Sequence, residues 1–254
     1  MTLFHRDYGS GHPLTILHGL LGSGGNWHTL SRSVFSESRR VVVADMRNHG
    51  KSPHDSRLDY EVMADDVVEL WDGMGVEASD LMGHSMGGKV AMQLALTHPE
   101  RVSRLVVVDM APRGYQPAHE ALFQALADAA PATKRSRAQV DAFLKDRIPD
   151  IGVRQFLLKN LAHGPDGLHW QMNLEAIVSN YDRILEGLTV FATYEGPTLF
   201  IRGGRSDYIL DDDNGIIQAY FPQAQLVTIP GAGHWVHAEA PGPFADAVTE
   251  FLAG

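Results

Sequence analysis

A serine flanked by glycines lies where a short apolar run gives way to a helical pattern. The segment Gly83-His84-Ser85-Met86-Gly87-Gly88 follows Leu81 and Met82, and apolar residues at helical spacing come after it. This strand, turn and helix context is the one in which G-x-S-x-G presents a nucleophilic serine. The glycines permit a sharp turn with a strained serine backbone, where a β-carbon two residues to either side would collide. We therefore predict that Ser85 is a nucleophile.

A serine hydroxyl is a weak nucleophile at neutral pH and needs a general base. Among the 13 histidines, His234 fits this role best, because it lies in a glycine-rich loop at residues 230–235. The loop separates the last apolar run from the last helical pattern. A late histidine after the serine agrees with the chain order serine, acid, histidine that accompanies this motif. We predict that His234 removes the proton from Ser85.

Two aspartates compete to be the acid that orients His234. Asp207 follows the apolar run at 199–201, and Asp109 ends the run at 105–108. Both carboxylates come at strand ends from which they could reach the distal nitrogen of the imidazole. The order of the strand-end loops favours Asp207, because its loop comes directly before that of His234. Asp109 would then be a structural hydrogen-bonding partner.

Acyl transfer also needs two backbone N–H groups that converge on the developing oxyanion. One comes from the residue after the nucleophile, which here is Met86, and the other from an early loop after a strand. The glycine-rich segment 18–23 follows the apolar run at 14–17. It predicts Leu20 as the second donor.

Short apolar runs bounded by turn residues alternate with helical patterns along most of the chain. The runs, several of them rich in valine and isoleucine, lie at residues 14–17, 41–44, 81–82, 105–108, 199–201 and 226–229. Such runs are typical of strands buried on both faces of a parallel sheet. Helical patterns cover 59–74, the stretch between Ser85 and Pro99, and 244–252. The alternation predicts an α/β fold with a mostly parallel central sheet and helices on both faces.

The alternation stops between about residues 113 and 196. The patterns there are helical, at 122–130, 140–148, 154–161 and 174–188, and no strand is evident. Insertions after a strand end commonly overhang ligand sites, because open sheets bind ligands beyond the carboxyl ends of their strands. We expect a core formed by residues 1–112 and 197–254, and a helical cap at 113–196. The substrate pocket is expected to include Leu21, Phe156, Leu157 and Trp170.

Composition narrows the classes of ligand and partner. The formal net charge is −10 and no dense run of Lys and Arg is present, which disfavours nucleic acid and anionic membranes. The absence of cysteine excludes a thiol nucleophile and a cysteine-based zinc site. No segment has the length of a membrane span or the form of a signal peptide. We expect a soluble, cytoplasmic protein that binds a small molecule, as a monomer or a small homo-oligomer.

Four segments together resemble the α/β-hydrolase superfamily and, within it, the YbfF-type esterases. They are residues 18–23, 45–53, 83–89 and 231–239, and the likeness runs from about residue 3 to the C-terminus, weakest in 113–196. The resemblance implies an α/β-hydrolase fold with a helical cap, no metal or organic cofactor, and carboxylesterase activity on short acyl or aryl esters. It also implies that the residue matching Asp109 is the regular acid, whereas position 207 varies and Ser206 recurs. The acid therefore stays open between Asp109 and Asp207.

The sequence thus predicts a serine carboxylesterase that cleaves small carboxylic esters through an acyl-enzyme. Two other classes remain open, because a fold does not fix its chemistry. A lyase or thioesterase could use the same scaffold, and a lyase would need cationic groups such as Arg47, Arg113 and Arg202 to hold an acidic substrate. A ligand sensor could keep the same residues for slow or single turnover.

Overall fold

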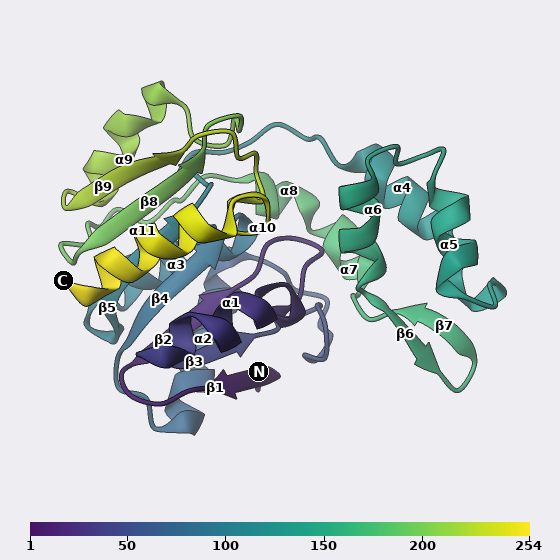
Figure 1. Cartoon of the computed structure of the whole chain (residues 1–254), viewed down its shortest axis with the longest axis horizontal. Helices are drawn as coiled ribbons and strands as arrows, with labels where there is room; N and C mark the ends of the chain where they lie inside the picture. The colour runs from purple at the N-terminus through teal and green to yellow at the C-terminus, as the bar shows by residue number, and fades with distance from the viewer.

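A seven-stranded sheet forms the centre of the protein, whose residues 1–254 are all described by a computed structural model. The strands are β1 (His5–Tyr8), β2 (Pro13–Leu17), β3 (Arg40–Ala44), β4 (Ser79–His84), β5 (Val102–Val108), β8 (Thr198–Gly203) and β9 (Ala224–Ile229). Their order across the sheet is β1-β3-β2-β4-β5-β8-β9 (Figure 1). Only β1 runs antiparallel to its neighbour. The prediction of a mostly parallel sheet is confirmed.

The six apolar runs of the sequence correspond to β2, β3, β4, β5, β8 and β9. The seventh strand, β1, was not predicted. It lies at the edge of the sheet, and all four of its residues are at least partly exposed. An edge strand of this kind carries no continuous apolar run, so periodicity does not reveal it.

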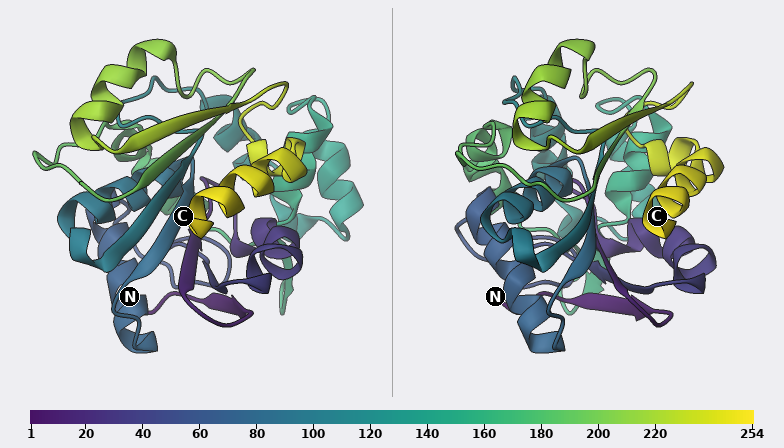
Figure 2. Two further views of the ribbon diagram at one scale, coloured as in Figure 1. Left: turned by 60° about the vertical axis from the view of Figure 1, so that its left-hand side comes forward. Right: turned by 90° about the vertical axis from the view of Figure 1, so that its left-hand side faces the viewer.

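Helices cover both faces of the sheet (Figure 2). Helices α1 (His28–Ser33) and α11 (Pro241–Ala253) lie on one face, and α2 (Tyr60–Met74), α3 (Met86–Thr97) and α9 (Asn214–Tyr220) on the other. Side chains of β3 show the alternation: Val41 and Val43 pack with Phe244 of α11, whereas Val42 packs with the opposite layer. A short helix, α10 (Val236–Glu239), connects β9 to α11. None of the helices combines the length and the apolarity that crossing a membrane would require.

Residues 113–196, here called the cap segment, leave the sheet after β5 and return at β8 (Figure 1). Its elements are α4 (Glu120–Asp128), α5 (Arg137–Leu144), α6 (Ile151–Leu158), β6 (Leu161–Gly164), β7 (Gly167–Trp170), α7 (Leu174–Ser179) and α8 (Tyr181–Leu185). The hairpin of β6 and β7 corrects the expectation of a purely helical segment. Each of its strands has four residues and only Leu168 is buried, so the hairpin leaves no hydrophobic periodicity in the sequence.

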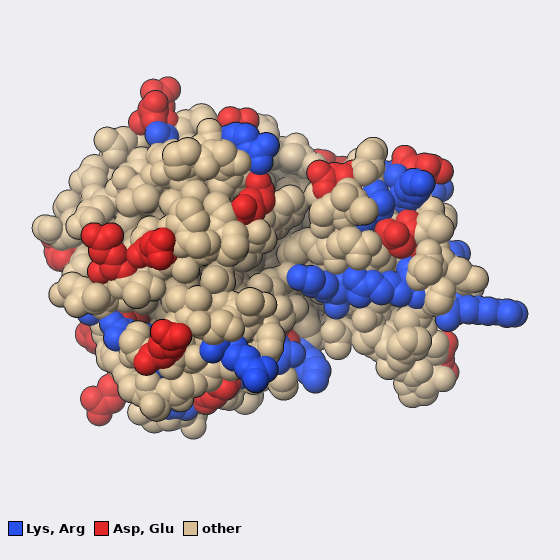
Figure 3. All heavy atoms as spheres, in the orientation of Figure 1, with Lys and Arg blue, Asp and Glu red and all other residues tan.

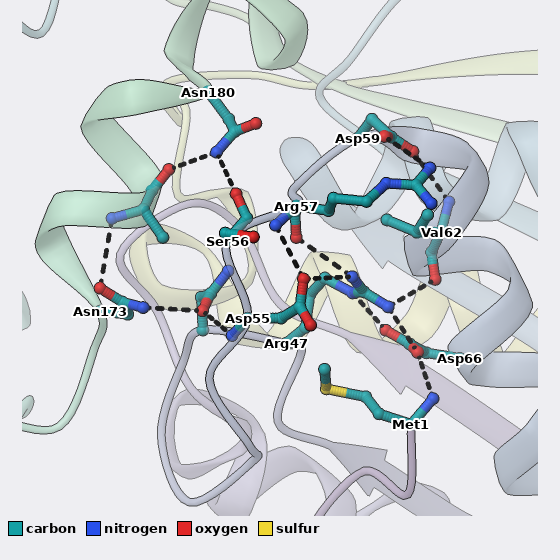
Figure 4. Close-up of polar contacts among 12 residues, drawn as sticks. Met1, Arg47, Asp55, Ser56, Arg57, Asp59, Val62, Asp66, Asn173 and Asn180 are labelled. Atoms are coloured by element: carbon teal, nitrogen blue, oxygen red, sulfur yellow. Dashed lines mark hydrogen bonds and ion pairs between the residues drawn. The ribbon is translucent and has the colours of Figure 1, made fainter.

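Polar contacts join the cap segment to the loop after β3 (Figure 4). Asn173 donates its backbone N–H to the carbonyl of Asn48 at 2.8 Å, and Asn180 donates its side-chain amide to the carbonyl of Ser56 at 2.8 Å. The loop is itself fixed from the other side, because Arg47 forms a bidentate ion pair with Asp66 of α2 at 2.6 and 2.8 Å. The position of α7 is therefore set by hydrogen bonds to the core.

Candidate active site

The turn between β4 and α3 places Ser85 at the N-terminus of a helix with strained backbone angles of φ 55° and ψ −120°. A β-carbon on Gly83 would lie 2.0 Å from the carbonyl oxygen of Gly87, and one on Gly87 would lie 2.5 Å from that of Leu17. The predicted crowding at both glycines is confirmed. The close contacts at the two glycines keep Ser85 in this strained conformation.

A serine, a histidine and an aspartate form a continuous chain of hydrogen bonds. Ser85 Oγ lies 3.0 Å from His234 Nε2, and His234 Nδ1 lies 2.8 Å from Asp109 Oδ2. With Nδ1–H donating to the carboxylate, Nε2 is free to accept the serine proton. This geometry meets the requirement that nucleophile, base and orienting acid lie within hydrogen-bond reach of one another.

Asp109 is fully buried at the end of β5, with a positive φ of 51°. Its Oδ1 accepts a hydrogen bond from the backbone N–H of Gly203 at 2.9 Å, and its Oδ2 accepts one from the hydroxyl of Ser206. These donors offset the cost of burying the carboxylate and hold Oδ2 towards the ring of His234. Ser206 therefore has a positioning contact that reasoning from single residues did not predict.

Asp207 lines the same cavity as His234 but makes no hydrogen bond or ion pair with it, although the order of the loops favoured Asp207 as the acid. Its side chain is exposed and its carboxylate makes no hydrogen bond to the protein, while its backbone carbonyl accepts one from Arg113 at 3.2 Å. The strand order explains the difference, since β5 lies directly beside β4, the strand that carries Ser85. The order of the loops along the chain therefore does not show which carboxylate reaches the imidazole.

Buried histidines support the loops that carry the site. His84, the residue before the serine, donates from Nε2 to the carbonyl of His234 at 2.9 Å. His18 donates from Nδ1 to the carbonyl of Gly19 at 2.8 Å and accepts at Nε2 from Met46 at 2.9 Å. Burial lowers the pKa of both rings, so both are neutral at neutral pH. The only sequence signal for them was their place inside the quoted motifs.

The two predicted oxyanion donors flank Ser85. Met86 is the first residue of α3, a position whose N–H has no partner within the helix. The N–H of Leu20 makes no hydrogen bond to another protein group. A β-carbon on Gly19 would lie 3.1 Å from that of Ser85, so the loop of Leu20 approaches the nucleophile closely.

A cavity of about 620 Å³ opens onto Ser85 and His234, within the size range of small-molecule sites. Its wall is mainly apolar, and the predicted residues Leu20, Leu21, Met86, Phe156 and Leu157 all line it. On the face that Figure 3 shows, acidic and basic side chains are dispersed over the outside of both the core and the cap segment. The cavity thus presents an apolar surface beside the three hydrogen-bonded side chains.

Trp170 does not line this cavity, contrary to the expectation from the sequence. It ends β7, where its indole Nε1 donates to the carbonyl of Leu126 at 3.1 Å. Its ring packs against a hydrophobic cluster that includes buried residues of the cap segment. Because its N–H is bonded to a carbonyl of the cap segment, Trp170 contributes to the packing of that segment.

Comparison with known proteins assigns the family. The family model described as alpha/beta hydrolase fold matches residues 12–241. The chain belongs to this family. This α/β hydrolase is 41% identical over 247 residues to the "sn-1-specific diacylglycerol lipase ABHD11" of Mus musculus, with 94% of this chain and 80% of that protein covered.

Two further relatives agree along nearly the whole chain. "Esterase YbfF" of Escherichia coli is 35% identical, with 94% of this chain and 92% of that protein covered. The solved structure titled "Marine microorganism esterase" has a TM-score of 0.96 and 40% identity, covering 98% of this chain and 99% of that one. The fold and the enzyme class, a hydrolase, are thereby shown.

The three arginines considered for an acidic substrate are all paired in this hydrolase. Arg47 pairs with Asp66 at 2.6 Å, Arg113 with Asp213 at 2.7 Å, and Arg202 with Asp211 at 2.6 Å. Of the three, only Arg113 lines the cavity. All three guanidinium groups are therefore already paired with a carboxylate, and none of the three is free to bind an anionic substrate.

Aromatic side chains surround the imidazole of this hydrolase. The ring of Tyr208 stacks on that of His234, with centroids 3.8 Å apart and an interplanar angle of 19°. A hydrogen bond fixes the backbone of Tyr208, because the hydroxyl of Tyr115 donates to its carbonyl at 2.7 Å. The stacking limits rotation of the imidazole. Tyr208 was not predicted, because no recognisable motif surrounds it in the sequence.

Proposed function

We propose that this hydrolase is a serine carboxylesterase that cleaves small carboxylic esters through an acyl-enzyme. The observation that carries the proposal is the chain of hydrogen bonds from Ser85 through His234 to Asp109, open to a mainly apolar cavity. Relatives named esterase and lipase, similar over nearly the whole chain, support an ester as the substrate.

The proposed reaction has two halves. His234 Nε2 takes the proton of Ser85 as its oxygen attacks the ester carbonyl, and the N–H groups of Leu20 and Met86 stabilise the oxyanion. His234 then donates that proton to the leaving alcohol, which leaves an acyl group on Ser85. A water molecule activated by the same ring attacks the acyl-enzyme and releases the acid. Asp109 orients the ring throughout.

We further propose that residues 113–196 act as a cap that shapes the substrate pocket. Phe156 and Leu157 of α6 and Leu122 of α4 contribute to the cavity wall opposite the core loops. Apolar side chains at these positions favour an apolar acyl chain. The pairing of Arg47, Arg113 and Arg202 leaves the lyase alternative without the cation it requires.

The test is hydrolysis of a panel of esters of graded acyl length by the wild type, Ser85→Ala and Ser33→Ala. Ser33 is an exposed serine of α1 and is the matched control. We expect Ser85→Ala to lose at least about a thousandfold in kcat while Ser33→Ala keeps the wild-type rate. A fluorophosphonate should add one covalent group to the wild type and none to Ser85→Ala. Retained turnover in Ser85→Ala would contradict the assignment of the nucleophile.

A further inference from the structure

One part of the cavity wall carries hydrogen-bonding side chains that the proposed reaction does not use. His119, just before α4, and Tyr181, the first residue of α8, both line the cavity that contains Ser85. Phe123 of α4 packs against both rings, with centroids 6.1 Å from His119 and 4.9 Å from Tyr181. The cap segment thus holds a histidine in a defined orientation in an otherwise mainly apolar wall.

The hydrogen bonds around Tyr181 determine which nitrogen of His119 carries the proton. The hydroxyl oxygen of Tyr181 accepts from the backbone N–H of Ala118 at 3.3 Å and lies 2.5 Å from His119 Nδ1. Burial first, and then the charge of His234, lower the pKa of His119, so the ring is neutral and has one N–H. Of the two protein groups bonded to the hydroxyl, only Nδ1 can accept its proton, because the other is an N–H donor. The ring proton is then on Nε2, which has no partner in the protein.

His119 and His234 line the same cavity, and so does Tyr208, whose ring stacks on His234. In acyl transfer from an ester, the catalytic histidine passes its proton to the oxygen of the leaving alcohol. The alcohol part of the substrate therefore lies beside His234, in the cavity that His119 also lines.

We propose that His119 Nε2–H is a specificity-determining donor that binds an oxygen on the alcohol part of the ester. The substrates would then be esters of polyols or hydroxyalkyl alcohols rather than of plain alkanols. This inference rests on the proposed esterase function, since it assigns the alcohol side of the same site. A donor held in a partly desolvated wall discriminates between an oxygen and a methyl group, because the methyl group leaves the N–H without a partner.

The test compares 2-hydroxyethyl butyrate with propyl butyrate, which differ by one hydroxyl in place of one methyl group. We expect the wild type to have the higher kcat/KM on the hydroxyethyl ester. In His119→Phe the ratio of the two kcat/KM values should fall about three- to tenfold, the range of one neutral hydrogen bond. His119→Gln, whose amide nitrogen can take the place of Nε2, should recover part of the ratio. His163→Phe, at an exposed position of β6, is the matched control.

A second pair of esters locates the hydroxyl on the substrate. Propyl 3-hydroxybutyrate and propyl 3-methylbutyrate differ in the same way on the acyl side, and their ratio should not respond to His119→Phe. A response of this acyl pair, or an unchanged ratio for the alcohol pair, overturns the inference and leaves the esterase function standing. Failure of the wild type to hydrolyse any of the four esters contradicts the esterase function itself. If His119→Phe does not fold, Tyr181→Phe, which releases Nδ1 from its donor, should lower the alcohol ratio in its place.

Discussion

The core loops and the cap segment meet at the same cavity, but they are built differently. On the core side, Asp109 accepts hydrogen bonds at both carboxylate oxygens, and His234 is held by its carbonyl as well as its ring. On the cap side, Phe156 and Leu157 touch the cavity through carbon atoms alone, and the bonded pair of His119 and Tyr181 is set among such apolar side chains. Directional bonds fix atoms to within tenths of an ångström, whereas apolar packing fixes only shape and volume. The core is therefore expected to determine the chemistry and the cap segment the choice of substrate.

The largest effect is expected in the core, where the chemistry takes place. There, two aspartates that each follow a strand should differ strongly when they are replaced. Asp109→Asn should lower kcat about 10⁴-fold, because an amide cannot hold the required tautomer of His234. Asp207→Asn should remain within about threefold of the wild type, because its carboxylate has no hydrogen bond to the protein. Steady-state kinetics on one butyrate ester, with circular dichroism to check folding, measures both. Equal losses in the two variants would restore Asp207 as a candidate acid.

A smaller effect is expected where the two regions are joined, at the fully buried Lys89 of α3. Its ammonium group donates to the carbonyls of Arg113 at 2.6 Å and Glu186 at 2.8 Å, near the two ends of the cap segment. The rings of Tyr60 and Tyr115 lie 5.6 and 5.4 Å away. Burial, and then the charge of Arg113, lower the pKa of Lys89 to about 7.

The sign of the pH dependence follows from this lowered pKa. An unfolded lysine has a pKa of about 10.4, so the unfolded chain binds more protons than the folded one between about pH 7 and 10. The free energy of unfolding of the wild type should rise with pH in that window, by up to about 1.4 kcal/mol per pH unit relative to Lys89→Met. Urea denaturation of both proteins at pH 7, 8 and 9 measures the difference. Parallel pH dependences would show that Lys89 does not titrate there.

The smallest expected effect separates two aromatic residues of the cap segment. Phe156→Ala enlarges the cavity and should raise KM for short esters by on the order of tenfold while favouring longer acyl chains. Trp170→Ala should leave the chain-length preference unchanged and lower the free energy of unfolding by about 1 kcal/mol, because its ring is only partly buried. Kinetics over the graded ester panel and thermal unfolding distinguish them. A changed chain-length preference in Trp170→Ala would mean that its ring reaches the substrate.

Much of the fold and part of the site could be predicted because their signals are local. Six of the seven strands in the sheet carry short apolar runs, including the edge strand β9, half of whose residues are exposed. The turn at Ser85 needs glycines at 83 and 87 within five residues of chain. The edge strand β1 and the hairpin of β6 and β7 have mostly exposed residues, so they leave no apolar period to detect. Local structure could therefore be predicted wherever consecutive residues carried a recognisable pattern of residue types.

Contacts between distant loops had no such pattern. Asp109 and Asp207 both follow strands, and only the packed loops show that Asp109 is the one bonded to His234. Likewise, the indole of Trp170 is directed inward by the carbonyl of Leu126, which is 44 residues away in the chain. Residue types and short spacings identify which groups can react, because backbone turns and burial depend on neighbours in sequence. Which groups meet depends on the order of strands and the path of the cap segment, which arise only when the whole chain packs.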